Sequence, residues 1–305
     1  MFAYFRAPVS WRELVRRTVA DTLEDDCPGL AAQLAFYFFL AVFPALLFLV
    51  SLLAYVPVGA TIGTPLARLE AILPAEIVMF IREQIEAAIS GSHGGLLTVG
   101  IAGAIWSSSS AVTAIITALN RAYDLDEWRP WWKRRLIAIW LTIALALFVV
   151  LAFTLVVGGA DLAEWVADRI GVGQTFARVW AVLQWPIACA LVVFAVDLLY
   201  HFAPNAETKW VWITPGALVA TGLWLMASGG FKLYVQNFGT YTAVHGAIGT
   251  VIVLMLWLYL SGFALLVGAE LNAEIDKALD ARDPAPRQPG QRKAIGPAAE
   301  QRRRT

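Results

Sequence analysis

The stretch LAAQLAFYFFLAVFPALLFLVSLLAY, Leu30–Tyr55, decides the class of fold. It exceeds the ~20 apolar residues that an α-helix needs to cross ~30 Å of hydrocarbon. About 30 residues precede it, which is too many for a secretory signal peptide, and no small-residue cleavage site follows it. The stretch therefore predicts a transmembrane helix.

The whole chain shares this apolar character. Apolar residues make up 59% of its 305 positions and charged residues only 15%, against about 45–50% and about 25% in a soluble domain. Most of the 13 tryptophans stand at the edges of apolar blocks, where the headgroup level of a bilayer favours them. The composition indicates a polytopic membrane protein.

The predicted fold is all-α, a bundle of six transmembrane helices with amphipathic helices at the membrane surface. The chain divides into a cytoplasmic amphipathic N-terminal segment, residues 1–30, a membrane domain, 31–280, and a disordered basic tail, 281–305. The spans are predicted at residues 31–56, 96–119, 136–157, 179–202, 211–235 and 247–270.

The N-terminal segment contains an amphipathic helix over residues 10–26. Its start, SWRE, is a capping box in which Ser10 and Glu13 each bond the backbone of the other. We expect this helix to lie on the membrane surface, and a second amphipathic stripe predicts another surface helix in the loop 57–95. The side chains expected on one face of the first helix are Trp11, Leu14, Val15, Thr18, Thr22 and Leu23.

Lysines and arginines set the expected orientation. They are concentrated before the first span, between spans two and three, and after span six, and they are sparse in the alternate loops. Because cytoplasmic loops carry the excess of these residues, both termini are expected in the cytoplasm.

The first span brings Gln33, Tyr37, Pro44 and Ser51 to one face at 100° per residue. Polar residues are costly inside a membrane, so this face should look into the bundle, and Pro44 should kink the helix. Either the face lines a polar path, or it only packs against neighbouring helices.

Span two has a hydroxyl-bearing face formed by Ser110, Thr113 and Thr117. Small hydroxylated residues let helices approach closely and bond across the contact. The face therefore either packs against another helix or lines a substrate path.

Span four ends with Asp197 and His201, four residues apart on one face. Because histidine titrates near neutral pH, one hypothesis is a pair that handles protons or cations. The alternative is an interfacial pair that neutralises itself or binds Arg121 or Arg135.

Span six ends with the segment LLVGAELNAEID. Ala264 and Gly268 form a small-residue contact face for another helix. Polar residues near this end share a predicted depth with others at the cytoplasmic side, and we hypothesise that they converge. The members of this cluster are Gln33, Asn120, Asp197, Glu270 and Asn272.

Enzyme signatures are missing from the sequence. His93, His201 and His245 lack metal-ligand spacing, and no nucleophile, phosphate-loop or zinc-protease motif occurs. Cys27 and Cys189 are not expected to form a disulfide. We therefore expect no enzyme activity, cofactor, metal or nucleic-acid partner, and membrane lipids and a lipid-like substrate as partners.

Four segments carry a family likeness: LAFYFFLAVFPALL (34–47), IWSSSSAVTAIITALNRAYD (105–124), GALVATGLWLMASGGFKLYVQNFGTY (216–241) and HGAIGTVIVLMLWLYLSGFALLVGAELNAEID (245–276). Together they resemble the YihY/BrkB family of bacterial inner-membrane proteins, once labelled ribonuclease BN-like. The likeness extends over residues 10–280. Ala41 and His245 depart from it, since the family usually has Ser and Tyr there.

The resemblance implies six helices in the bacterial cytoplasmic membrane and no accepted biochemical activity. A ribonuclease reading is rejected, because the sequence has no acidic metal cluster and no phosphate cradle. The expected function is that of a transporter or flippase-like protein for a lipid-like or amphipathic envelope component. The alternative is a non-transporting envelope-integrity or scaffold protein.

Overall fold

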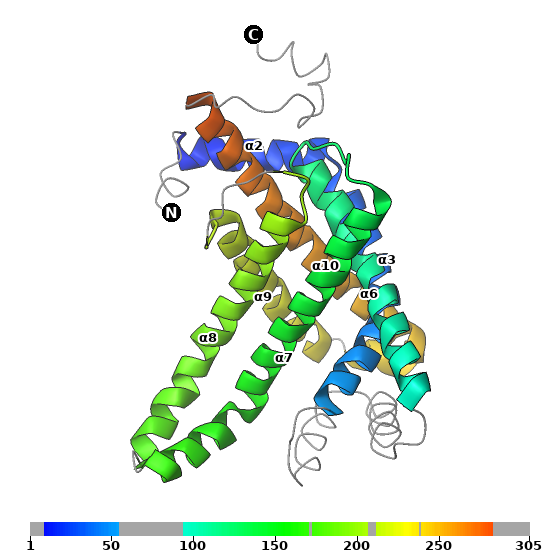
Figure 1. Cartoon of the computed structure of the whole chain (residues 1–305). Helices are drawn as coiled ribbons and strands as arrows, with labels where there is room; N and C mark the ends of the chain where they lie inside the picture. The colour runs from blue at the N-terminus through cyan, green and yellow to red at the C-terminus, as the bar shows by residue number, and fades with distance from the viewer. Residues whose placement is uncertain (1–8, 55–93, 171–172, 207–211, 238, 283–305) are drawn as a thin grey trace. The chain divides into compact units, whose positions relative to one another are not determined.

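The computed structural model describes residues 9–54, 94–170, 173–206, 212–237 and 239–282 (Figure 1). The predicted surface helix within 57–95 and nearly all of the predicted tail lie outside these ranges. Regular structure in the described ranges is entirely helical. The helices are α2 (Trp11–Glu24), α3 (Cys27–Ala54), α6 (Gly94–Ala122), α7 (Trp131–Ile170), α8 (Gly173–Phe202), α9 (Pro215–Asn237) and α10 (Gly239–Arg282).

Five of the described helices contain segments long and apolar enough to cross a membrane, which confirms the membrane helix bundle. Six spans were predicted; the side chains of α3 (Cys27–Ala54) are described only as far as Val42, and that part, Cys27–Val42, is shorter than a span. The five candidate spans are Ala102–Ala122, Trp131–Val156, Arg178–Phe202, Pro215–Tyr234 and Val251–Ala281.

The candidate spans expose large apolar side chains rather than burying them. In α7 and α8, Leu147, Val149, Val182 and Trp185 are all exposed. A water-soluble protein rarely presents continuous apolar surface of this kind, whereas lipid tails solvate it without penalty. These surfaces are therefore suited to contact with lipid.

The chain divides into two compact units. Unit 1 comprises Met1–Phe39, Val112–Leu141 and Val192–Thr305, and unit 2 comprises Leu40–Ala111 and Thr142–Leu191. Unit 1 thus holds α2, α9 and α10 together with the start of α3, the end of α6, the start of α7 and the end of α8. The polar clusters described below all lie within unit 1.

Helices α9 and α10 form the closest helix pair of unit 1 and run antiparallel. Near one end Gly216 faces Gly268, and a Cβ atom on either glycine would meet the backbone carbonyl of the other. Near the other end the Trp257 indole donates a hydrogen bond to Ser228 at 3.2 Å. The predicted small-residue contact face at Gly268 is confirmed, because only glycine permits this approach.

Helix α2 lies across the end of α10 (Figure 1). Leu14 packs with Leu271 and Ile275 in a buried apolar cluster. Ser10 caps the helix as predicted, accepting a hydrogen bond from the Glu13 amide at 3.4 Å. The Glu13 carboxylate is bound by Arg16 and Arg17, at 2.8 and 2.9 Å, rather than by the backbone of Ser10.

Candidate functional site

The first polar cluster of unit 1 is centred on Thr214, at the N-terminus of α9. Its hydroxyl accepts a hydrogen bond from the Ala217 amide at 3.2 Å, which is the usual N-cap interaction. Pro215 follows as the first helical residue, where its missing N–H has no cost. The sequence Thr-Pro-Gly therefore starts this helix by local chemistry alone.

Asn272 of α10 completes the cap from a second helix. Its side-chain carbonyl accepts the Gly216 amide at 2.8 Å, and its amide donates to the Thr214 hydroxyl at 3.0 Å. The Gly216 N–H belongs to the first turn of α9 and has no partner within its own helix. Asn272 thus both satisfies this buried donor and fixes the α9–α10 contact.

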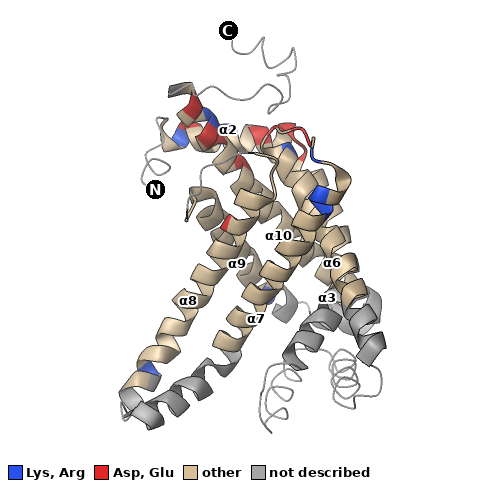
Figure 2. Cartoon of the chain, in the orientation of Figure 1, with Lys and Arg blue, Asp and Glu red and all other residues tan. Residues whose placement is uncertain are grey.

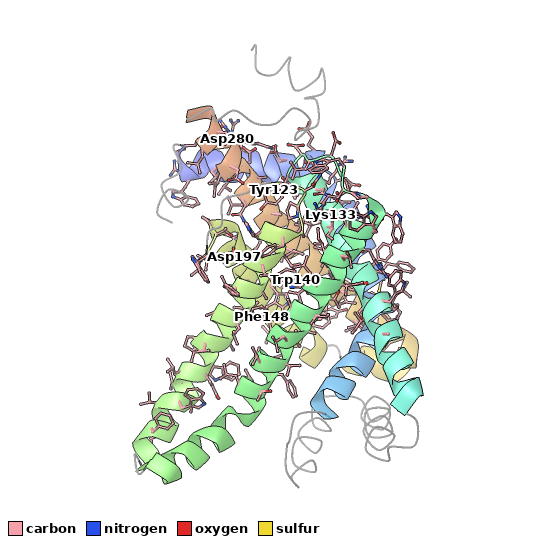
Figure 3. The ribbon with its side chains drawn as sticks, viewed as in Figure 1. Tyr123, Lys133, Trp140, Phe148, Asp197 and Asp280 are labelled. Atoms are coloured by element: carbon pink, nitrogen blue, oxygen red, sulfur yellow. The ribbon has the colours of Figure 1, made fainter. Side chains whose placement is uncertain are left out.

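Asp197 of α8 is the third member of this group, and it is buried. It accepts hydrogen bonds from the Thr214 amide and from the Thr214 hydroxyl. A carboxylate beside the N-terminus of a helix also gains from the helix dipole. We call Asp197, Thr214, Gly216 and Asn272 the α9 cap cluster; Figure 3 shows Asp197 farther from α2 than Tyr123 and Asp280.

The proton- or cation-handling pair of Asp197 and His201 stays a prediction, and the structure adds partners from outside α8. The hydrogen bonds of Asp197 come from Thr214, seventeen residues later in the chain. The His201 ring is half-buried and stands edge-on to Phe202, with 4.6 Å between the ring centroids. Asp197 therefore has a structural partner that spacing along its own helix could not reveal.

Glu270 lies on a different side of α10 from Asn272 and is fully buried. One carboxylate oxygen accepts a hydrogen bond from the Cys27 thiol, at 3.2 Å, at the start of α3. The other oxygen is the one buried carboxylate oxygen in the described part of the chain that has no hydrogen-bond partner. Buried polar atoms are nearly always paired, so this unused acceptor marks Glu270, with Cys27, as a candidate site.

A second cluster ties the loop between α6 and α7 to the end of α8. Arg129 binds both oxygens of Glu127 at 2.7 Å and donates to the Ala203 carbonyl at 2.9 Å. Asn120 donates to Glu127 at 2.9 Å and accepts the Asn205 amide at 2.7 Å. Burial alone would raise the pKa of Glu127, but the hydrogen bonds and charge of Arg129 lower it on balance.

Lys277 of α10 forms a third cluster with acids from three segments. Its ammonium lies 2.9 Å from Asp21 of α2, 3.1 Å from Asp124 after α6, and 2.9 Å from Glu274. Figure 2 shows charged residues gathered around α2 and the end of α10.

Asp25 lies beside the Lys277 cluster and pairs with Arg121 at 3.2 Å. Its pKa is raised by burial and by the nearby charge of Asp124, despite the opposing effects of Arg121 and Lys277. Burial and the charge of Asp124 therefore disfavour the negatively charged form of Asp25.

The polar face predicted for the first span is not buried as a unit. Gln33 is exposed and Tyr37 is half-buried, whereas Ala31 and Leu34 are buried. A Cβ atom added at Gly262 would lie 3.3 Å from the Leu34 side chain, so α3 turns its small and apolar residues toward α10. The prediction that Gln33 looks into the bundle is wrong, and the side chains of Pro44 and Ser51 lie outside the described residues.

The hydroxyl face of span two is also placed differently from its prediction. Thr117 is exposed and bonds the Thr113 carbonyl of its own helix at 3.1 Å, while Thr113 and Ser110 are half-buried. The buried face instead carries Ile116 and Leu119. Small residues, Ser109 and Ala118, are buried on the same side, which lets a neighbouring helix approach closely.

Of the predicted polar cluster, the structure therefore joins only part. Asp197 and Asn272 meet through Thr214, Asn120 belongs to the Arg129 cluster, and Glu270 binds Cys27. Thr214, Arg129 and Lys277 were missed by sequence reasoning. The Thr-Pro start of α9 and the acidic run before Arg129 were the available signals.

The fold and the buried polar clusters define a polytopic helical membrane protein. The chain belongs to the family described as Virulence factor BrkB, which it matches over residues 18–293. No three or more His, Cys, Asp or Glu side chains of the described residues are placed to hold a metal ion, and both cysteines are free.

Several relatives support this membership. The chain is 36% identical over 247 residues to a putative ribonuclease-like protein YfkH of Bacillus subtilis, covering 81% of this chain and 89% of that protein. It is 29% identical over 256 residues to a UPF0761 membrane protein of Halorhodospira halophila, covering 82% of this chain but 54% of that one. A UPF0761 membrane protein of Tolumonas auensis is 27% identical over 278 residues, with 85% and 86% covered. No solved structure matches the chain.

Proposed function

We propose that this protein is a transporter or flippase-like protein of the bacterial cytoplasmic membrane, acting on a lipid-like or amphipathic envelope component. The observation that carries the proposal is the Glu270 carboxyl, fully buried with one oxygen unpartnered among the described residues. A buried carboxyl without full pairing costs several kcal/mol when charged. Ionisable groups kept buried in protein at such a cost are functional candidates.

Glu270 is a better candidate than Asp197, because the two acids differ in their spare bonding capacity. Asp197 is held by an amide and a hydroxyl of Thr214, and a carboxylate with such partners serves the cap of α9. Glu270 has only the weak thiol donor of Cys27. Its free oxygen can take a proton or a cationic group of a substrate.

The test is lipid translocation in reconstituted vesicles, followed with a fluorescent phospholipid and a membrane-impermeant quencher. Glu270→Gln should abolish translocation while keeping the thermal midpoint within a few degrees, since the amide fills the same space. Tyr200→Phe is the matched control, because it also removes one buried polar bond, the 2.6 Å bond to the Leu265 carbonyl. Equal translocation by wild type, both variants and protein-free vesicles would contradict transport of that lipid class.

The alternative is an envelope-integrity or scaffold protein that transports nothing. The α9 cap cluster and the Arg129 cluster favour it, because both lock helices together with satisfied hydrogen bonds. In a deletion strain with an envelope phenotype, complementation by both Glu270→Gln and Asp197→Asn at normal expression would support the scaffold. Loss of complementation by Glu270→Gln alone would support the transporter.

A further inference from the structure

Helix α2 has three faces, and one of them is not covered by any residue in the described part of the chain. The docking face carries Leu14, Thr18 and Thr22, which are buried against unit 1. A separate row, spaced four residues apart, is exposed by half or more of each side chain. This apolar flank consists of Trp11, Val15, Val19 and Leu23.

The angular order of these faces is that of a helix at a boundary of three media. At 100° per residue the apolar flank is centred about 80° from the docking face. Arg12 and Arg16 border the far edge of the flank, and Glu13 and Glu24 lie on the side opposite it. The helix therefore has a protein face, an apolar face and a polar face in succession, with cations at the edge between apolar and polar.

The depth of α2 in unit 1 coincides with the end of the hydrocarbon layer. Leu14 packs against Leu271 and Ile275 of α10, where the long apolar run of α10 ends and the charged residues Glu274 and Lys277 follow; charged side chains are costly in hydrocarbon. Helix α2 thus crosses α10 where acyl chains give way to headgroups.

Exposed tryptophans mark the same level independently. Trp128, Trp131 and Trp132 are exposed around the start of α7, and tryptophan concentrates at the headgroup level. The α6–α7 connection that carries them is joined to α2, because Lys277 binds both Asp124 and Asp21. The tryptophans and the apolar flank therefore belong to one end of unit 1.

We propose that the apolar flank of α2 is inserted into the membrane interface, with Arg12 and Arg16 bound to anionic phospholipid headgroups. Amphipathic helices with apolar residues on one side and arginines at its edge bind this way. Anionic headgroups attract such arginines within a Debye length. The surface is an anionic-lipid site that anchors the docked helix, and it is independent of whether the protein transports a substrate.

The test places an environment-sensitive nitrobenzoxadiazole probe on α2 of the full-length protein in nanodiscs. Cys189→Ala removes the accessible cysteine, and buried Cys27 stays. The probe is attached through Val19→Cys on the flank, and through Glu24→Cys on the polar face as the matched control. Discs contain phosphatidylcholine alone or mixed with phosphatidylglycerol, with a doxyl-labelled lipid as quencher.

We expect the fluorescence of the probe at position 19 to be blue-shifted and to be quenched by doxyl lipid severalfold more than that of the probe at position 24. Phosphatidylglycerol should increase this quenching, and combining Arg12→Gln with Arg16→Gln should remove the increase. Equal quenching at both positions would overturn the proposed orientation. A blue shift at position 19 without lipid quenching would overturn it too, since a second copy or another protein would then cover the flank. Quenching that does not change with the phosphatidylglycerol content would overturn the proposed binding of Arg12 and Arg16 to anionic headgroups.

Discussion

At the scale of single residues, the polar side chains of α10 divide by whether their bonding capacity is used. Asn272 uses its carbonyl and its amide to complete the cap of α9, while Glu270 keeps one oxygen unpartnered. A satisfied buried group stabilises and an unsatisfied one destabilises. The two residues stand two positions apart, on different sides of α10, and have opposite consequences for stability.

Replacing Asn272 by Leu should destabilise the protein strongly. The substitution keeps the branched shape of the side chain but leaves the buried Gly216 N–H without an acceptor, at a cost of about 1–3 kcal/mol. A lowered thermal midpoint in detergent would show this. Ser261→Ala serves as the control, because its hydroxyl bonds only the Trp257 carbonyl of its own helix. Equal midpoints for both variants would contradict the capping role of Asn272.

Glu127→Gln should change how stability depends on pH. Because the folded pKa of Glu127 is lowered, the ionised side chain stabilises the fold above its unfolded pKa of about 4.3, and this stability is lost as pH falls through the folded pKa. The variant should therefore unfold about 1 kcal/mol more easily at pH 7, and its difference from wild type should shrink as pH falls below the unfolded pKa. Thermal midpoints measured across this range check it, and a constant difference at all pH values would exclude the charged pair with Arg129 as the cause.

Sequence reasoning found individual polar residues better than their partners. Asp197 and Asn272 stood out because polar groups are rare in apolar segments, and both are buried. Thr214 could not be matched to them, since it lies in the connection before α9, and its contacts depend on how α8, α9 and α10 pack. The prediction that Gln33 looks into the bundle was wrong because the small residues on the opposite face of α3 let that face pack more closely against α10.

At the scale of elements, glycine governs the α9–α10 contact. Gly268→Ala would press a methyl group against the Gly216 carbonyl and the Tyr200 hydroxyl, which overpacking data place at about 1–3 kcal/mol or more. Gly222→Ala is the matched control, because no other atom lies within 4 Å of its added Cβ. The thermal midpoint should fall for the first variant and stay or rise slightly for the second. A fall of the same size in both would show that helix flexibility, not close contact, is decisive.

Lys277 is expected to hold α2 in place on α10. Lys277→Met keeps the aliphatic length and leaves Asp21, Asp124 and Glu274 without their shared cation, which costs more than a surface pair of about 0–1 kcal/mol. Hydrogen exchange of residues 11–24 should accelerate in this variant. In detergent without anionic lipid, Arg16→Met, which there breaks an exposed pair with Glu13, should leave the exchange nearly unchanged. Unaltered protection in Lys277→Met would assign the docking to the Leu14 cluster alone.

The helices themselves could largely be predicted from the sequence, but which face of each helix contacts protein could not. Helix spans follow from apolar length, and the capping signal at Ser10 located the start of α2. Periodicity alone put Leu14 and Trp11 on one face, since both are apolar at helical spacing. The structure separates them, because one contacts α10 and the other is exposed, and a single sequence cannot distinguish burial in protein from burial in lipid.

At the scale of the whole molecule, the contact between α2 and α10 determines which ends lie together. Leu14 lies against Ile275, and Asp21 binds Lys277 at 2.9 Å. Both segments must then face the same side of the membrane, which requires an even number of crossings between them, so α3 would have to cross in addition to the five candidate spans. This conclusion uses packing alone and does not depend on the charge bias that names that side as the cytoplasm.

Reporter fusions test sidedness and orientation separately. Green fluorescent protein joined before residue 1 or after Arg282 should fluoresce at both ends, and alkaline phosphatase should be inactive at both, since excess lysine and arginine stay in the cytoplasm. A fusion between α7 and α8, beyond the span Trp131–Val156, should behave in the opposite way and serves as the control. Opposite results at the two ends would contradict the α2–α10 contact. If the reporters at both ends indicated an external location, the α2–α10 contact would stand, and only the orientation inferred from charge would be overturned.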